Sequence, residues 1–174
     1  MSNSPIPTGK LEKAILKSDE SDDIEFQFNP TSLSFNQSID LDAETAARTE
    51  SGDPKVSFKG PCSRTLSISD IKFDTYETGE NVIEKYIGKF LKALDFAEKG
   101  EAKGKRPPTY TFIWGQNQYI RRCFIESLDF DITRFLIDGT PVQAVISSLT
   151  LTEIESVTAS GSTNPFGRGS GPNR

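Results

Sequence analysis

The chain contains no histidine, and this absence removes a large part of enzyme chemistry. Histidine is the commonest general base near neutral pH and the commonest metal ligand. Nucleophiles activated by histidine, of the Ser-His or Cys-His kind, are therefore excluded. The sequence also has no GxGxxG motif and no GxxxxGK motif followed by Ser or Thr, so no loop that cradles phosphate is indicated. We predict that the protein is not an enzyme, has no catalytic residue and binds no cofactor.

Carboxylates are plentiful, but none lies in a pattern that specifies a site. Five acidic residues fall between Asp19 and Glu25. This stretch lacks the glycine and the ligand spacing of a calcium-binding loop, so we interpret it as an acidic turn and predict no metal site. A pair of acids that hydrolyses glycosides is defined by its separation in space, and the sequence leaves that alternative open.

Cysteine, methionine and tryptophan are scarce, and long apolar runs are missing. The two cysteines, Cys62 and Cys123, lie in different segments, and we predict a reduced pair, although a disulfide depends on geometry. No apolar run approaches the roughly 20 residues that cross a bilayer, and Met1–Lys10 has no apolar core of a secretory signal. We expect synthesis in the cytoplasm, no direct insertion into a membrane, and an unconventional route for any export.

Basic residues are too few and too scattered for nucleic-acid binding. The formal net charge is −5 and the pI is about 4.9. Basic clusters exist at 103–106 and at Arg121–Arg122, but each is short. Affinity for a nucleic-acid backbone comes from clustered Lys and Arg, so we predict that nucleic acid is not a partner.

A length of 174 residues fits one compact domain with short tails. The 12 phenylalanines indicate aromatic packing of a β-sheet. Most of the chain shows the two-residue period or the bounded apolar runs of strands. We predict strands over residues 11–18 (with a short helix as the alternative), 24–28, 32–39, 56–58, 64–73, 110–114, 119–130 and 142–154. The dipeptide Asp138–Gly139 predicts a tight hairpin turn before the last of these.

Helical periodicity occurs once, over residues of about 80–98. One stripe of seven apolar residues, spaced at three and four, predicts a helix that lies flat on the sheet. The members of this stripe are Val82, Ile83, Tyr86, Ile87, Phe90, Leu91 and Leu94. Thr78 is the predicted N-cap, and Lys99–Gly100 the predicted end. The predicted fold class is thus mainly β with one flanking α-helix.

Three segments show no periodicity. Residues 1–9 form a predicted N-terminal arm, and residues 159–174 a Gly/Ser-rich tail that is too polar to pack alone. Between them, the predicted domain covers residues 10–158. Within it, residues of about 40–55 form a predicted extended loop, and a loop of that length in a compact domain docks on something or serves a function. Residues 101–108 are predicted to form an exposed linker.

Four segments, in this order and spacing, resemble a known family. The first is FNP with the following strand, residues 28–35, and the second is LSISDIKFDTYETGENVIEKY, residues 66–86. The third is PPTYTFIWG, residues 107–115, and the fourth is FIESLDFDITRFLIDGTPVQAVISSLTL, residues 124–151. Together they resemble the tube-type domain of baseplate proteins of contractile injection systems, the group that includes a LysM-bearing adaptor next to the spike. The resemblance covers residues of about 10–155.

The resemblance implies a structural ring subunit at the base of the inner tube, which adapts the spike to the tube and initiates tube assembly. The fold implied is a tail-tube-like antiparallel β-sandwich or barrel with a flanking helix and a loop that reaches the adjacent layer. The partners implied are identical subunits in a hexameric ring, the tube protein or a second initiator ring, the spike trimer and other baseplate components. The protein would be part of a phage-tail-like particle, either released or anchored in the envelope. No LysM module follows the tube domain in this chain, so contacts attributed to LysM are not implied.

Two alternatives remain open at this point. The first is a main tube or tube-terminator subunit of a phage-like tail. The second is a monomeric carbohydrate-binding β-domain, for which Trp114 with Tyr110 and Tyr119 would form a sugar platform, although alternation places Tyr110 and Trp114 on the core face of one strand.

The sequence offers two sets of candidate residues for an assembly protein. Residues in the irregular arms are candidates for contacts between subunits: Asp40, Leu41, Arg48, Asp53, Lys55, Phe166 and Arg168. Residues at strand ends and turns are candidates for structural roles: Phe73, Asp74, Trp114, Gly115, Asp138 and Gly139. Plain packing and turn geometry account for the second set more simply than direct contact with a partner.

Overall fold

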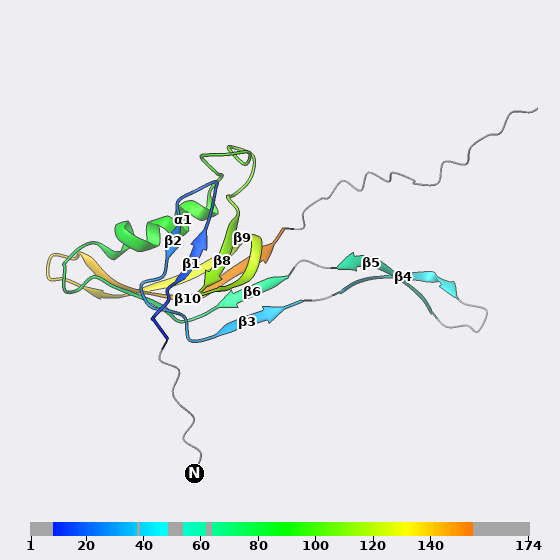
Figure 1. The fold of residues 1–174 in the computed structure, drawn as a ribbon, viewed down its shortest axis with the longest axis horizontal. Coiled ribbons are helices and arrows are strands. Elements are labelled where there is room, and N and C mark those ends of the chain that lie inside the picture. The colour runs from blue at the N-terminus through cyan, green and yellow to red at the C-terminus, as the bar shows by residue number, and fades with distance from the viewer. Residues whose placement is uncertain (1–8, 38, 49–53, 62–63, 155–174) are drawn as a thin grey trace, which may run out of the picture.

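The computed structural model describes residues 9–37, 39–48, 54–61 and 64–154, and for 39–48 and 54–61 it describes the backbone alone. The described part is mainly β, as predicted, and consists of one antiparallel sheet of eight strands, a separate pair of strands and a single helical segment (Figure 1). Residues 1–8 of the predicted arm (1–9) and the predicted tail at 159–174 lie outside the described residues, as does Cys62.

The main sheet has the order β2-β1-β8-β9-β10-β6-β3, and β7 also pairs with β10. All of its pairs are antiparallel. The strands are β1 (Ala14–Lys17), β2 (Ile24–Glu25), β3 (Leu33–Asn36), β6 (Thr65–Ile68), β7 (Ile71–Asp74), β8 (Tyr110–Trp114), β9 (Asn117–Phe135) and β10 (Pro141–Glu153). The separate pair consists of β4 (Ile39–Arg48) and β5 (Pro54–Pro61).

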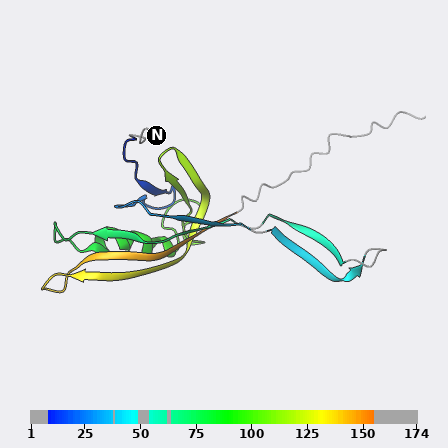
Figure 2. The ribbon, with the colours of Figure 1, turned by 90° about the horizontal axis from the view of Figure 1, so that it is seen from below.

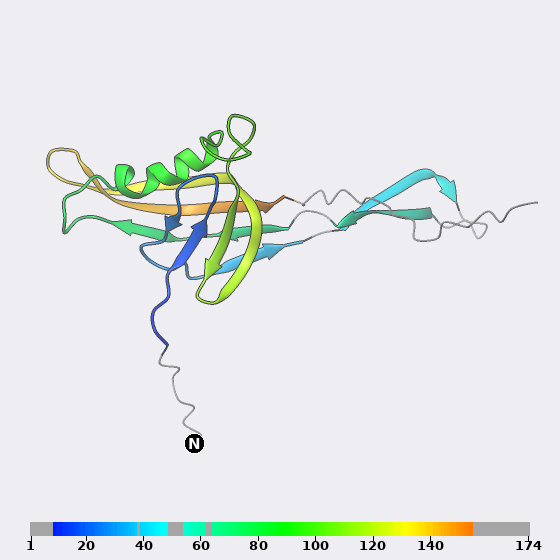
Figure 3. The ribbon, with the colours of Figure 1, turned by 45° about the horizontal axis from the view of Figure 1, so that its top comes forward.

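One continuous sheet provides both layers of the predicted sandwich because β9 is long and bent. β9 has 19 residues, pairs with β8 over its first part, and pairs with β10 over the rest. Register shifts along both ladders and the left-handed backbone of Arg122 (φ 46°) bend the strand. As a result, β1, β2 and β8 fold over the layer formed by β10, β6 and β7 (Figure 3).

Four predicted strands are shorter or more broken than their patterns indicate: 11–18 and 32–39 are shortened to β1 and β3, and 24–28 and 64–73 differ more. In the segment 24–28, Ile24 and Phe26 are buried but Phe28 is half-exposed, since the strand ends at Glu25. The segment 64–73 is divided into β6 and β7 by a turn in which Asp70 has a φ of 57°. Asp is one of the few residues that tolerate this left-handed conformation, so the break could not be seen in the alternation of apolar residues.

The helix is shorter than the predicted 80–98. It consists of a π-helical turn, η1 (Ile83–Ile87), followed by α1 (Gly88–Leu94). Asn81, not Thr78, lies at its start, where Asn81 Oδ1 accepts a hydrogen bond from the N–H of Ile83 (2.9 Å). The extended backbone of Asp95 ends it. Within the predicted stripe, Leu91 and Leu94 remain over one third exposed, whereas Ala93, which was not part of the stripe, is fully buried.

The predicted loop of about 40–55 is corrected by the structure. The segment contains β4 and the start of β5, which pair with each other in a two-stranded ribbon. This ribbon projects from the end of the main sheet (Figures 1 and 2). A ribbon outside the main sheet needs no buried face, so most of β4 is polar or alanine, and apolar alternation is limited to Ile39 and Leu41 at its start and to Val56 and Phe58 in β5.

The segment predicted as an exposed linker, 101–108, is folded into turns. The N–H of Ala97 donates to the carbonyl of Arg106 (2.9 Å), and the N–H of Gly104 donates to the carbonyl of Ala97 (3.0 Å). Ala102 is buried beneath these turns. The segment is therefore attached to the domain at both of its ends.

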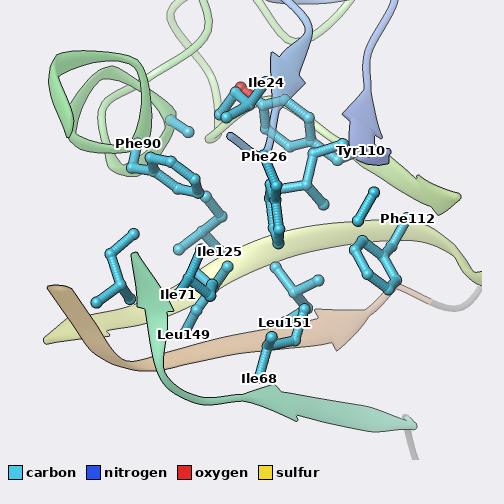
Figure 4. Close-up of a cluster of buried hydrophobic side chains, with 14 of the residues drawn as sticks. Ile24, Phe26, Ile68, Ile71, Phe90, Tyr110, Phe112, Ile125, Leu149 and Leu151 are labelled. Atoms are coloured by element: carbon cyan, nitrogen blue, oxygen red, sulfur yellow. The ribbon is translucent and has the colours of Figure 1, made fainter. Parts of the chain in front are cut away.

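Seven aromatic rings form a continuous row through the core, with neighbouring ring centroids 5.0–6.2 Å apart. In order along the row these are Tyr86, Phe73, Phe90, Phe26, Phe112, Tyr119 and Phe35. The middle of this row lies between the two layers of the sheet and the helix (Figure 4). Aromatic pairs at such distances add to the free energy gained from burial, so the row joins the helix, β7, β8 and β9 into one core.

We predict that Phe90→Ala lowers the free energy of unfolding by about 3–5 kcal/mol, because a fully buried ring with two aromatic neighbours leaves a cavity. Urea denaturation followed by circular dichroism measures the effect. Phe96→Ala is the matched control, since Phe96 is 61% exposed just beyond the same helix, and its effect stays within about 0.5 kcal/mol. Equal losses for both variants would show that the row is not central to stability.

Candidate assembly surface

The sheet has an open edge on each side. β3 pairs with β6 on one side, and no described strand pairs with its other side. On one side, residues 124–135 of β9 pair with β10. β8 pairs with β9 only as far as Cys123, so the other side of residues 124–135 has no described partner strand. Unpaired strand edges are sites where another chain adds strands. The two edges bound a four-strand segment of the sheet, β3-β6-β10-β9.

A side chain, rather than a strand, closes the edge of β7. Gln27 Oε1 accepts a hydrogen bond from the N–H of Asp74 (2.7 Å), and Gln27 Nε2 donates to the carbonyl of Asp74 (2.8 Å). The amide of Gln27 thus makes the two hydrogen bonds that a neighbouring strand would make at this residue. On this side of the sheet, β3 is thus the strand whose outer edge carries no such contact among the described residues.

One face of the four-strand segment is polar and rich in hydroxyl groups. Ser34 lies opposite Ser67, Ser67 opposite Thr150, and Thr150 opposite Ser127, so one hydroxyl residue from each strand forms a row across the sheet. Leu66, Ile68, Leu149 and Leu151, which alternate with this row, are buried on the opposite face. The sheet thus has a core face and a face with no described layer on it.

Acidic side chains extend this polar face along β9. Glu126, Asp129 and Asp131 are exposed, and Thr152 Oγ1 donates a hydrogen bond to the Glu126 carboxylate. Asp129 and Asp131 lie opposite Ser148 and Val145. The face is therefore hydrophilic and carries more acidic than basic groups along this strand.

The candidate contact residues fall on the ribbon or outside the described part of the chain. Asp40, Leu41 and Arg48 lie on β4, and Lys55 lies on β5. The ladder places Arg48 opposite Pro54 and Leu41 opposite Phe58. Asp53, Phe166 and Arg168 are not among the described residues. The structure therefore brings four of the seven candidates into one ribbon that stands apart from the main sheet (Figure 2).

The candidate structural residues are located in packing and turns. Phe73 is fully buried in the aromatic row, and Trp114 is partly buried against the core. Asp74 Oδ1 accepts from the N–H of Tyr76 and Oδ2 from Gln143 Nε2, both at 2.8 Å. Gly115, Asp138 and Gly139 form the two hairpin turns, and both glycines have positive φ, 61° and 85°. A side chain at either glycine would be strained.

The rings of the alternative sugar platform are not gathered on one exposed surface. Tyr110 is 1% exposed, and its hydroxyl finds no hydrogen-bond partner among the described residues. Trp114 and Tyr119 are partly buried and pack against the core cluster. A flat aromatic surface that stacks on a sugar is therefore not formed by these three residues.

Two important features were missed in the sequence. The closure of β7 by Gln27 joins residues 47 positions apart, and no local pattern marks it. The hydroxyl row also depends on the register of four strands. A signal for it was present, however: Ser34, Ser67, Ser127 and Thr150 all occupy the polar positions of alternating segments.

The lowered pKa of Glu20 has a structural cause. Arg106 donates two hydrogen bonds to the Glu20 carboxylate (2.7 and 2.8 Å), and the N–H and hydroxyl of Thr109 donate two more (2.8 and 2.9 Å). These donors, Arg106 first, lower the pKa of Glu20 from 4.5 to about 2. Burial raises the pKa of the Cys123 thiol to about 12, so this free cysteine stays protonated and unreactive.

Among residues 9–37 and 64–154, whose side chains are described, no group of three or more acidic or cysteine side chains is placed to hold a metal ion. The helical segment within that part of the chain is too short to cross a membrane. The features that remain are open edges, a polar face and a projecting ribbon. These are features of a protein that binds other proteins.

A comparison with protein families agrees with this description. A family model described as contractile injection system tube protein matches residues 10–160. The match covers the whole described sheet and the ribbon. No curated protein matches the chain.

We predict that Glu20→Gln destabilises the protein at pH 7 by about 1–2 kcal/mol, a range reduced for solvent screening. The folded-state pKa of Glu20 lies below its unfolded value, so its stabilisation is complete above pH 4.5 and is lost as the pH falls towards 2. Wild-type and variant should therefore converge in stability as the pH falls through this window, as measured by urea denaturation.

The matched control is Glu98→Gln, an exposed carboxylate on the neighbouring loop that makes no hydrogen bond with a described residue. It should leave the pH dependence unchanged. A constant difference between wild-type and Glu20→Gln from pH 7 to pH 2 would contradict the assigned pKa.

Proposed function

Since the chain belongs to the contractile injection system tube protein family, we propose that it is a structural ring subunit at the base of the inner tube, where it adapts the spike to the tube and initiates tube assembly. The observation that supports a ring most directly is the four-strand segment with one open edge on each side. The base of the tube is proposed on the sequence resemblance to the adaptor group.

The two open edges differ, which fits a ring. The edge of β3 on one copy pairs with the edge of β9 on the next, so each contact joins two different surfaces. Such heterologous contacts close into a ring when the rotation from one copy to the next is a whole fraction of a full turn. Pairing also satisfies backbone groups that would otherwise attract unrelated strands. The family implies assembly with other subunits, and the proposed partners are identical copies in a hexameric ring.

The polar face of the sheet lines the channel in this arrangement. A closed ring of sheets has one concave and one convex face. The core face carries the helix and the layer of β1, β2 and β8, which are too bulky for the inside (Figure 3). The hydroxyl row of Ser34, Ser67, Thr150 and Ser127, with the acids of β9, therefore faces the lumen. A mostly hydrophilic wall, interrupted by the partly exposed Phe124 and Val145, lets a polar cargo pass without binding it.

The ribbon of β4 and β5 is the proposed arm towards an adjoining layer or component. It projects beyond the end of the sheet and pairs only within itself among the described elements (Figure 1). An arm of this kind gains a buried face when a partner covers it. The proposed partners in the adjoining layers are the tube protein or a second initiator ring on one side and the spike trimer with baseplate components on the other.

A main tube subunit is the second candidate function. The open edges and the polar lumen face serve any layer of a tube equally well. The number of copies in a purified particle separates the two candidates, because a main tube subunit repeats in every layer and an initiator occupies only the first.

We predict that assembly protects the amide hydrogens of both open edges. Hydrogen exchange of the isolated chain and of assembled rings should differ at residues 33–36 and within 124–135, where edge amides gain partners. Asp74 is the internal control, since Gln27 already bonds its N–H in the free chain. Protection that changes at Asp74 but not at β3 or β9 would overturn edge pairing.

We predict that deleting the gene abolishes inner tubes while sheath and tube subunits are still made. The physical reason is that the first ring supplies the surface on which later tube subunits bind and become ordered. Electron microscopy of particle preparations measures the outcome, and expression of the wild-type chain from a plasmid is the control. Full-length contractile particles in the deletion strain would disprove the initiator role.

A further inference from the structure

A groove with a volume of about 410 Å³ lies between the segment that follows β2, the turn that follows β7 and the π-helical turn η1. Each of these three segments contributes one aromatic residue to its lining, namely Phe28, Tyr76 and Tyr86. Phe28 is 52% exposed, and Tyr76 is 46% exposed. Large rings that stay half-exposed around a concave surface indicate a binding site. We call this site the aromatic groove.

The walls of the aromatic groove are held in place by contacts within the domain. The two hydrogen bonds between the Gln27 amide and the backbone of Asp74 (2.7 and 2.8 Å) join the wall that carries Phe28 to the wall that carries Tyr76. The Asp74 carboxylate in turn accepts a hydrogen bond from the N–H of Tyr76 (2.8 Å). The ring of Tyr86 stacks on the aromatic row, 5.0 Å from its neighbour. A groove that is already formed costs a ligand little ordering entropy.

The charges around the aromatic groove balance. Lys85 pairs with Glu80, and the Arg134 guanidinium lies 3.6 Å from the centre of the Tyr76 ring. Three basic and three acidic residues line the groove or contact a residue that lines it: Lys13, Lys85, Arg134, Asp74, Glu77 and Glu80. The groove therefore favours neither an acidic nor a basic ligand, and an uncharged apolar segment fits it best.

The N-terminal arm joins the domain beside the aromatic groove. Asn29 Nδ2 donates a hydrogen bond to the carbonyl of Glu12 (2.8 Å). The Lys13 ammonium donates to the carbonyl of Gln27. Residues 12 and 13 are thus bonded to the two residues on either side of Phe28, which forms the near wall of the groove.

The arm has the composition of a ligand for such a groove. Residues 1–8 read MSNSPIPT and contain no charged side chain. The run Pro5–Ile6–Pro7 favours the polyproline II conformation, because proline fixes its own φ and restricts the residue before it. Polyproline II segments bind in grooves lined by aromatic rings. Five residue steps separate Pro7 from Glu12, about 15 Å at roughly 3.1 Å per residue, which is long enough to bring the run past Phe28.

We propose that the Pro5–Ile6–Pro7 run docks in the aromatic groove of its own chain, with its apolar side chains against Phe28 and Tyr76. A short tether gives the run an effective concentration in the millimolar range, so a weak contact is enough to keep it bound. The docked arm covers two half-exposed rings that the domain leaves uncovered among its described residues. The contact needs one chain only, so it holds whether or not the proposed ring forms.

Nuclear Overhauser effects in the full-length chain test the docking. Wild-type chain should show them between the methyl protons of Ile6 and the ring protons of Phe28 and Tyr76. The double variant Pro5→Ser/Pro7→Ser should lose them, and so should Phe28→Ser. Tyr76→Ser is a second groove variant, and each groove variant removes a ring that is about half exposed, so the core stays intact. Phe96→Ser is the matched control, since it removes a 61% exposed ring that does not line the groove, and it should keep the signals.

A peptide added from outside tests the groove separately from the tether. A synthetic peptide of residues 1–8, added at millimolar concentration to the Pro5→Ser/Pro7→Ser chain, should shift the amide resonances of 27–28, 74–78 and 85–86 in a saturable way. The same peptide should leave the Phe28→Ser chain unshifted. Wild-type chain should respond less than the proline variant, because its own arm competes for the groove.

Three results would overturn the proposal. Wild-type chain without contacts between Ile6 and the two rings would show that the arm does not occupy the groove. Signals that survive in both Phe28→Ser and Tyr76→Ser would place the arm elsewhere on the domain. Signals that arise only between labelled and unlabelled chains in a mixture would assign the groove to the arm of a neighbouring copy.

Discussion

The aromatic row is the interaction on which the rest of the structure depends. Seven rings, each 5.0–6.2 Å from the next, run from Tyr86 on the helix to Phe35 on the edge strand. They come from six separate parts of the chain, so no local segment can complete the core without the others. A core of this kind forms cooperatively. Because the row lies entirely on one side of the sheet, it also determines which face is left without a cover.

Because the core lies on one side of the sheet, the two faces of the sheet differ in what covers them. The helix and the strands β1, β2 and β8 collect on the core face (Figure 4). The other face then needs hydrophilic side chains, and Ser34, Ser67, Thr150 and Ser127 supply them in register. A sheet with one covered face and one hydrophilic face is suited to line a water-filled channel, provided that neighbours close its edges. The same polar face would serve no purpose in binding a small apolar ligand.

The sequence predicts those parts of the fold whose signals are local. The alternation at 110–114 and 142–154 and the Asp138–Gly139 turn predict β8, β10 and the hairpin, because each depends on near neighbours. In the ribbon, apolar alternation is limited to Ile39 and Leu41 and to Val56 and Phe58, so the pairing of β4 with β5 could not be predicted from 42–55. The helix ends at Leu94, where the backbone of Asp95 becomes extended, before the predicted end at Lys99–Gly100. Of the candidate assembly surface, the sequence could indicate the segment at about 40–55 but not the open edges, which require the register of distant strands.

Gln27 affects which strand edges of the domain are free for the proposed pairing between copies. On one side of β10, β6 and β7 lie end to end, so an incoming strand could in principle pair beyond either of them. Beyond β6 lies β3, which is open, and beyond β7 lies the amide of Gln27, which bonds both backbone groups of Asp74. In the proposed ring, β3 is the edge on this side that receives a neighbour. The register of that pairing is restricted, because sliding by one residue would place the hydroxyl row of the neighbour on the wrong face. By occupying the Asp74 end of the β7 edge, Gln27 would favour pairing at β3 over pairing at β7.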